Sequence, residues 1–170
     1  MTGTYRIKKA FLWPFTAAVV LLLVLLGVLL AGGQPWEKIA ALIIFLISLM
    51  VAVESWRRRI VLADDGLIVS KFFRSKKFTW AEITHLGVLV IRNKAYFLLT
   101  TTRGFSMFSN LYENHTALLG ALYDRLGEEK TEPEIKDYLN HPVERFSLFV
   151  MAWVAAAVVV VVTILKLFNP

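Results

Sequence analysis

The chain has 170 residues, of which 57% are apolar and 19% are charged, and its formal net charge is +6. This composition is more apolar than that of a soluble globular domain and predicts membrane-spanning segments. The polar middle region, residues 57–145, is large enough for one small domain, which excludes a two-lobed enzyme. The absence of cysteine excludes disulfides, thiolate metal sites and cysteine nucleophiles.

The first apolar run, residues 11–31, is 21 residues long and carries no charge. As a helix it would be about 31 Å long, which is enough to cross a bilayer. The alternative is a cleaved signal peptide, because basic residues precede the run and the small residues Ala31, Gly32 and Gly33 follow it. The run is longer than the apolar core of a signal peptide, which favours a membrane span.

Two further apolar runs complete the membrane part. Residues 36–56 begin and end with the interfacial anchors Trp36 and Trp56 and follow the first run closely, so the two runs form a helical hairpin. The third run is residues 146–165. We therefore expect four parts: an N-terminal tail and transmembrane hairpin (1–56, with spans at about 11–31 and 36–56), a cytoplasmic domain (57–127), a juxtamembrane linker with a short helix (128–145), and a third transmembrane helix with a tail (146–170).

Lysine and arginine counts predict the orientation. Three lie in the amino-terminal tail and three at residues 57–59, against one at the hairpin loop, Lys38, and one at the carboxyl tail, Lys166. Because excess positive charge stays in the cytoplasm, we expect the N-terminus and the middle domain to be cytoplasmic and the C-terminus to be outside. Glu54 is the ionisable group that lies deepest in a span, and an interfacial ion pair with Arg58 explains it. The helices are therefore expected to be anchors, with a small transporter or channel accessory subunit as an alternative.

Short β-rich runs separated by turn residues predict six strands in meander order, at residues 59–63, 67–73, 76–79, 86–91, 95–101 and 105–108. Asp64, Asp65 and Gly66 form the first hairpin turn, with Gly66 supplying a positive φ. Arg74 and Ser75 form the second turn.

One amphipathic helix follows the strands, with an apolar stripe from Leu111 to Leu126. Asn110, with Glu113 three residues later, predicts a capping box at its start, and Gly127 fits a C′ glycine. His115 lies within the stripe, and we interpret it as a core residue at the border of the stripe. In the linker, residues 134–139 form a short helix.

Three features of residues 60–126 resemble the bacterial pleckstrin-homology-like (PH-like) domains of small membrane proteins: the hairpin Asp65-Gly66-Leu67, the segment Trp80-Ala81-Glu82-Ile83, and the closing helix. The resemblance implies a multi-pass protein of the bacterial inner (cytoplasmic) membrane. The fold class expected is membrane α plus α+β: a transmembrane helical hairpin, a PH-like antiparallel β-meander closed by one C-terminal helix, and a third transmembrane helix. Such a scaffold hosts many functions and does not by itself assign one.

Several residues of this domain are expected to be structural. Thr79 and Glu82 cap a single helical turn, while Trp80 and Ile83 pack against the sheet; the alternative for Trp80 is a ligand-stacking role. The structural set comprises Gly66, Trp80, Glu82, Ile83, Asn110 and Gly127.

Known catalytic patterns do not occur in the sequence. The three histidines have no metal-binding spacing, and there is no glycine-rich phosphate loop and no Gly-x-Ser-x-Gly motif. We therefore expect no enzyme activity, no cofactor, no metal and no small-molecule substrate.

Charge is distributed unevenly along the domain. Residues 57–103 contain ten Lys or Arg against three Asp or Glu, whereas residues 104–145 contain four against eight. A basic segment next to a span attracts anionic headgroups, and phosphoinositide-binding PH domains use a basic hairpin, so the resemblance implies a headgroup site here. Nonspecific attraction is the alternative, and nucleic acid is not expected because no aromatic platform interleaves with the basic residues. The candidate membrane-surface residues, called the basic cluster below, are Arg57, Arg58, Arg59, Lys71, Arg74, Lys76 and Lys77.

These features predict a non-enzymatic membrane protein whose domain is tethered at both ends and acts as a protein-interaction or scaffold module, as a subunit of a membrane complex. The alternative is an anionic-lipid-binding sensor. The expected partners are membrane lipids, mainly anionic, and another membrane protein or a second copy.

Overall fold

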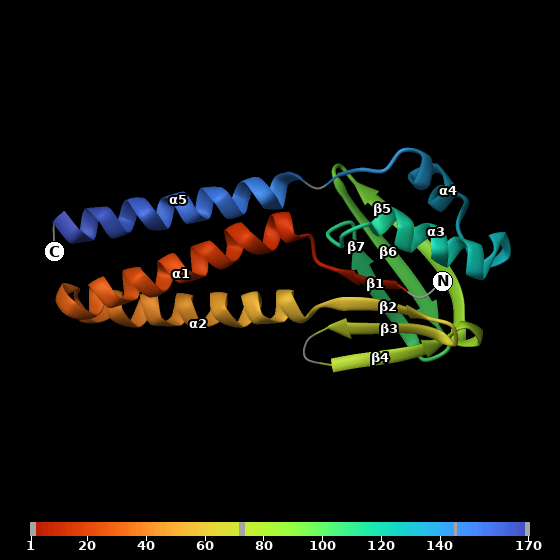
Figure 1. Ribbon diagram of the computed structural model, residues 1–170, viewed down its shortest axis with the longest axis horizontal. Helices are drawn as coiled ribbons and strands as arrows, with labels where there is room; N and C mark the ends of the chain where they lie inside the picture. The colour runs from red at the N-terminus through yellow and green to blue at the C-terminus, as the bar shows by residue number, and fades with distance from the viewer. Residues whose placement is uncertain (1–2, 72–73, 145, 169–170) are drawn as a thin grey trace. The chain divides into compact units, whose positions relative to one another are not determined.

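The computed structural model describes residues 3–71, 74–144 and 146–168 (Figure 1). The chain divides into two compact units, one formed by residues 1–8 and 57–146 and the other by residues 9–56 and 147–170. The first unit is wider than the expected domain of residues 57–127, because the amino-terminal tail and the linker belong to it. Phe73, the expected end of the second strand, and Arg145 lie outside the described residues.

The second unit consists of three long apolar helices, α1 (Lys9–Gly32), α2 (Pro35–Arg57) and α5 (Phe146–Phe168). Each is long and apolar enough to cross a membrane, with mean hydropathies of 2.8, 2.3 and 2.9 over an 18-residue window, and this confirms that the three expected segments are long apolar helices. Most of their apolar side chains are exposed, which lipid tolerates and water does not.

Polar contacts join these helices near their ends. Trp56 donates its indole N–H to the Thr16 hydroxyl at 2.9 Å, and its ring meets Trp13 edge to face. At the opposite ends, Lys166 of α5 pairs with Glu37 of α2 at 2.6 Å. The helical hairpin and the third helix therefore form one unit.

The first unit contains two antiparallel sheets, and within each sheet the strands follow chain order. The four-stranded sheet consists of β1 (Gly3–Arg6), β2 (Arg59–Ala63), β3 (Gly66–Lys71) and β4 (Arg74–Thr79). The three-stranded sheet consists of β5 (Ile83–Ile91), β6 (Lys94–Thr101) and β7 (Gly104–Ser109). A short 3-10 helix, η1 (Trp80–Glu82), links the sheets.

Two helices complete this unit, α3 (His115–Leu126) and α4 (Pro133–Asn140), separated by the 3-10 helix η2 (Glu128–Lys130). The core is assembled from both sheets and both helices. At its centre, the ring of Phe97 lies 5.2 Å from the tilted ring of Phe108 and meets the ring of Tyr138 edge to face at the same centroid distance. Its largest fully buried apolar residues are Ile60, Leu67, Ile83, Leu86, Phe97, Leu99, Leu118, Leu119, Leu122 and Ile135.

The described residues form seven strands, and the strand missed from the sequence is β1. It pairs with β2, with Tyr5 opposite Ile60, and Ile7 then bridges to Tyr112 after β7. Because β1 precedes α1 and β2 follows α2, this pairing places the tail and the polar domain on the same side of a membrane crossed by α1 and α2.

The structure differs from both expected turns, the one at Arg74 and Ser75 in its position and the one at Gly66 in the reason for the glycine. Arg74 and Ser75 are not a turn but the first residues of β4, paired with Lys71 and Ser70. Gly66 does not take a positive φ. A β-carbon at Gly66 would lie 2.0 Å from the Phe78 carbonyl oxygen, so glycine is required by the close approach of β4.

The expected N-cap of the amphipathic helix is wrong. Asn110 is fully buried, and α3 begins at His115 after Asn114, which takes a φ of +50°. Residues 110–113 instead bond to the amino-terminal segment, since Leu111 accepts from the Lys8 amide and Glu113 donates to Arg6. The C-terminal prediction is confirmed: Gly127 has a φ of +75° and donates its amide to Tyr123.

Candidate interaction surfaces

The register of the four-stranded sheet separates the basic cluster into two groups. Lys71 pairs with Arg74, and Arg59 pairs with Ser70. The Lys71–Arg74 pair therefore lies one position beyond Arg59, at the end of the sheet where the chain arrives from α2. Five members of the cluster lie at this end: Arg57, Arg58, Arg59, Lys71 and Arg74.

Lys77 belongs elsewhere. It lies on β4 opposite Ile68, nearer the β2–β3 turn, and its ammonium group pairs with Asp65 at 2.5 Å. The hydrogen bond from Lys77 lowers the pKa of Asp65. Lys76 points to the other face of β4, because successive side chains of a strand alternate. The seven residues thus do not form one headgroup pocket.

The exposed charges of β4 also have a structural explanation. β4 is an edge strand, and Arg74, Ser75, Lys76 and Lys77 are all exposed. Charged side chains on an edge prevent pairing with a second chain. The part of the basic cluster on β4 therefore serves solubility whether or not it binds lipid.

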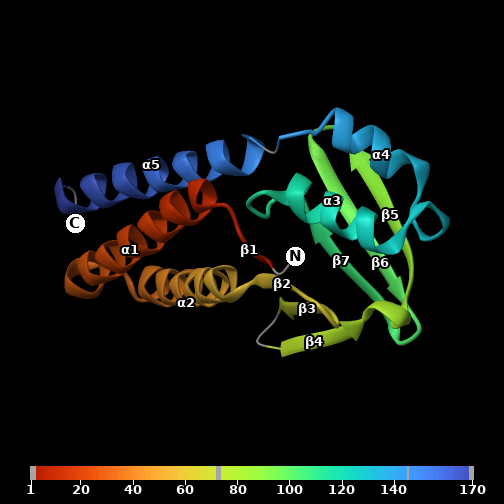
Figure 2. The ribbon, with the colours of Figure 1, turned by 45° about the vertical axis from the view of Figure 1, so that its right-hand side comes forward.

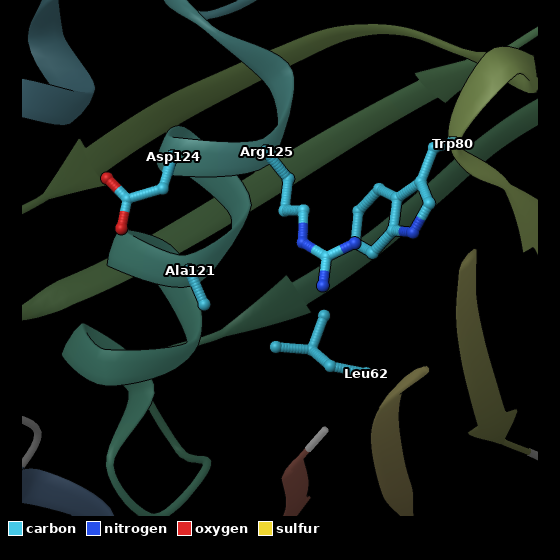
Figure 3. A pocket seen from close by; sticks show the side chains of 5 residues that line it. All are labelled: Leu62, Trp80, Ala121, Asp124 and Arg125. Atoms are coloured by element: carbon cyan, nitrogen blue, oxygen red, sulfur yellow. The ribbon is translucent and has the colours of Figure 1, made fainter. Parts of the chain in front are cut away.

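Trp80 lines a hollow of about 130 Å³ between η1 and α3 (Figure 3). Its indole N–H donates to the Asp64 carbonyl at 3.0 Å, and the guanidinium of Arg125 lies over the ring, 5.4 Å from its centroid. Arg125 also donates to the Asp64 carbonyl at 3.3 Å. Because Arg125 covers one face of this half-buried ring, Trp80 ties α3 to the β2–β3 turn, and a stacked ligand would have only the other face.

The neighbouring residues Glu82 and Ile83 have the expected structural roles. Glu82 accepts the Thr79 amide at 2.9 Å, and this hydrogen bond lowers the pKa of the carboxyl. It also pairs with Arg103 at 2.8 Å. Ile83 is fully buried.

The outer face of the three-stranded sheet is apolar and was not foreseen from the sequence. Leu98 is 40% exposed, Met107 45% and Phe105 72%. Leu98 pairs with Met107, and Phe105 pairs with Thr100 two positions further along β6, so the three side chains share one face. The signal that could have revealed this face is Leu98 next to Leu99, since a strand with one buried face normally alternates apolar and polar residues.

The free edge of β5 is covered by the chain itself. Glu132 donates its amide to the Leu86 carbonyl at 3.0 Å, and its carboxylate accepts the Val88 amide at 2.9 Å and lies 3.1 Å from His85. The hydrogen bonds from His85 and Val88 lower the pKa of Glu132. β7 lies at the other edge of this sheet.

A buried polar network connects α3, α4 and the segment before α5. His115 lies 3.0 Å from the Tyr138 hydroxyl, which donates to the Val143 carbonyl at 3.3 Å. Asn110 donates to the same carbonyl at 2.7 Å. Burial lowers the pKa of His115 and raises that of Tyr138. His115 is only 2% exposed, which confirms its expected place in the core.

Together these features define an integral membrane protein that carries one polar domain of two antiparallel sheets and two helices. Within the described residues, no group of three or more His, Cys, Asp or Glu side chains could hold a metal ion. Comparisons with protein-family models, with curated proteins and with solved structures found no match.

Proposed function

We propose that this chain is a non-enzymatic, multi-pass membrane protein whose polar domain docks a partner membrane protein through the outer face of β5, β6 and β7. The observation that carries the proposal is the exposure of Leu98, Phe105 and Met107 on that face, called the apolar face below. Contiguous exposed apolar side chains on a folded domain mark interaction sites. A domain joined to membrane helices at both ends meets partners that are held in the same membrane.

The domain plan belongs to the proposal. Two antiparallel sheets of four and three strands, followed by a helix, support a PH-like domain. The distribution of Lys and Arg supports a bacterial inner membrane location with the tail and domain in the cytoplasm and the C-terminus outside.

The edge strand β7 indicates how a partner would bind. β7 borders the apolar face, whereas the free edge of β5 is covered by Glu132. An extended partner segment can add to a sheet edge through main-chain hydrogen bonds, with alternate side chains resting on the adjacent face. The partner chemistry that fits is therefore an extended segment with apolar residues at alternate positions.

Photo-crosslinking in native membranes tests this function. A crosslinking amino acid at Met107 is expected to capture one partner protein in stoichiometric yield, and the same residue at the exposed Lys136 on α4 should not. Phe105→Ser, which removes an apolar side chain from the same face, should reduce capture at position 107. Equal capture at both positions, or capture of nothing but lipid, would contradict the docking function.

An anionic-lipid-binding module is the second candidate. It is favoured by the register that gathers Lys71 and Arg74 beside Arg59 at the α2 end of the sheet. Cations near an anionic surface contribute about 1 kcal/mol each. Charge reversal at Lys71 and Arg74 in the full chain, reconstituted in mixed phosphatidylglycerol and phosphatidylcholine nanodiscs, should reduce enrichment of phosphatidylglycerol. Reversal of Lys77 should have a smaller effect because Asp65 already pairs with it. Unchanged enrichment in the first variant rules this candidate out.

A further inference from the structure

The tip of the β5–β6 hairpin is apolar on both faces. Leu89 is 60% exposed, Val90 44% and Ile91 51%. Successive side chains of a strand point to opposite faces, so Val90 lies on one face and its two neighbours on the other. A strand that packs on a core has one buried face and one polar face. Leu89, Val90 and Ile91 give the tip neither a buried face nor a polar face. This pattern suits an environment that is apolar on both sides of the hairpin.

The tip is also basic. Arg92 and Asn93 form the turn between Ile91 and Lys94, which are paired. No Asp or Glu occurs anywhere in residues 83–112. Arg92 takes a φ of +53°, where glycine would be unstrained, so the sequence keeps a cation at a position that disfavours it.

The tip lies beside the segment that leads into α5. The Asn110 side-chain nitrogen donates to the Asn93 carbonyl at 3.3 Å and to the Val143 carbonyl at 2.7 Å, so one atom joins the turn to this segment. Figures 1 and 2 both show the β5–β6 turn next to the chain between α4 and α5. α5 begins at Phe146, three residues after Val143, which limits the separation to about 11 Å of extended chain.

We propose that the hairpin tip, Leu89 to Lys94, inserts into the headgroup and acyl boundary of the membrane that α5 crosses. Val90 and Ile91 enter the apolar part of the interface, and Arg92 and Lys94 bind lipid phosphates. The occupant is lipid and not protein, because the tip is joined to the segment that leads into a membrane span and its strands and turn carry cations but no Asp or Glu. Glu144, which follows Val143 in that segment, is paired with Lys8. Leu89 and Ile91 lie on the same side of the sheet as the apolar face, since Leu89 pairs with Tyr96 two positions from Leu98, whereas Val90 lies on the opposite side. The tip contains no residue of the basic cluster.

The chain contains no cysteine, so a single introduced cysteine can be labelled uniquely in the full-length protein. We would label Ile91→Cys and, separately, Val90→Cys with an environment-sensitive fluorophore, in vesicles that contain nitroxide-labelled lipid. Phe105→Cys is the matched control, since Phe105 is exposed on the same sheet but lies on β7, opposite Thr100 at the end of β6 away from the tip. Val158→Cys in α5 reports successful reconstitution.

The tip labels should be quenched at least about twofold more than the label at position 105, as expected for side chains within the interface. Greater quenching in phosphatidylglycerol vesicles than in phosphatidylcholine vesicles would show that Arg92 and Lys94 contribute. Equal quenching in the two would assign the contact to the apolar side chains, and both results support insertion. Tip labels quenched no more than the label at position 105, in protein whose label at position 158 is quenched, would overturn the proposal.

Discussion

Asn110 provides a quantitative test of how the polar domain is held together. It is fully buried and donates one hydrogen bond to Val143 and another to Asn93. Asn110→Ala removes both, at about 1 kcal/mol each, and leaves a small cavity that costs about 1 kcal/mol more. The amide oxygen of Asn110 has no hydrogen-bond partner among the described residues, so its removal recovers about 1 kcal/mol of desolvation. The net loss of stability should be about 2 kcal/mol.

Amide hydrogen exchange of the full-length protein in detergent measures this loss. The opening free energy of the β5 and β6 amides should fall by about 2 kcal/mol in Asn110→Ala, because these strands contain the turn that Asn110 holds. Asn114→Gly is the matched control. Asn114 is exposed and takes a φ of +50°, so glycine there should change stability by less than about 1 kcal/mol and in the favourable direction.

The reasoning would be refuted if Asn110→Ala changed the opening free energy by less than about 0.5 kcal/mol, the usual effect of a surface substitution. It would also be refuted if exchange rose only in α3. That result would mean that Asn110 acts as the helix cap that its sequence position suggested, and not as a link to Val143.

Three further predictions concern the same domain. Gly66→Ala should destabilise the domain by about 3 kcal/mol or more, because the new β-carbon would lie 2.0 Å from the Phe78 carbonyl oxygen. Gly120→Ala should stabilise the domain by up to about 1 kcal/mol, because Gly120 lies in α3 with open space around it, and thermal unfolding compares the two variants. Burial lowers the folded-state pKa of His115, so the unfolded state binds the proton more tightly and the stability of the domain should fall as the pH drops below about 6.5. His115→Gln should weaken this pH dependence, and a pH-independent stability in the parent protein would contradict the prediction. Arg92→Gly should raise the unfolding temperature, because glycine adopts the positive φ of this turn position without strain. A lower unfolding temperature in the variant would contradict the turn geometry.

The apolar helices could be predicted closely from the sequence. The expected spans at 11–31, 36–56 and 146–165 each differ by a few residues from α1, α2 and α5. Length and apolarity of a segment suffice for this prediction because the bilayer is a uniform solvent of fixed thickness. Local pairing gave comparable success in the first hairpin, where the expected strand at 59–63 matches β2.

The failures share a physical cause, which is that distant contacts decide the local structure. β1 has four residues, too few for a periodic pattern, and its partner β2 is more than fifty residues away along the chain. Asn110 has the spacing of a capping box with Glu113, but its burial against Val143 outweighs the modest free energy of a cap. The basic cluster could be found by counting charges, whereas its division required the register between β3 and β4.

The polar domain can form only from segments on both sides of the spans. Arg6 pairs with Arg59 where the chain enters α1 and leaves α2, and Lys8 pairs with Glu144 shortly before α5 begins. Residues 110–113 bond to the amino-terminal segment that leads into α1, and Asn110 bonds to Val143 in the segment that leads into α5. One short loop therefore contacts both segments. The strand before α1 and the segment before α5 are therefore integral parts of the fold. It follows that the domain completes its core only after α1 and α2 have been synthesised, because β2 and every later element of the domain follow these helices in the chain.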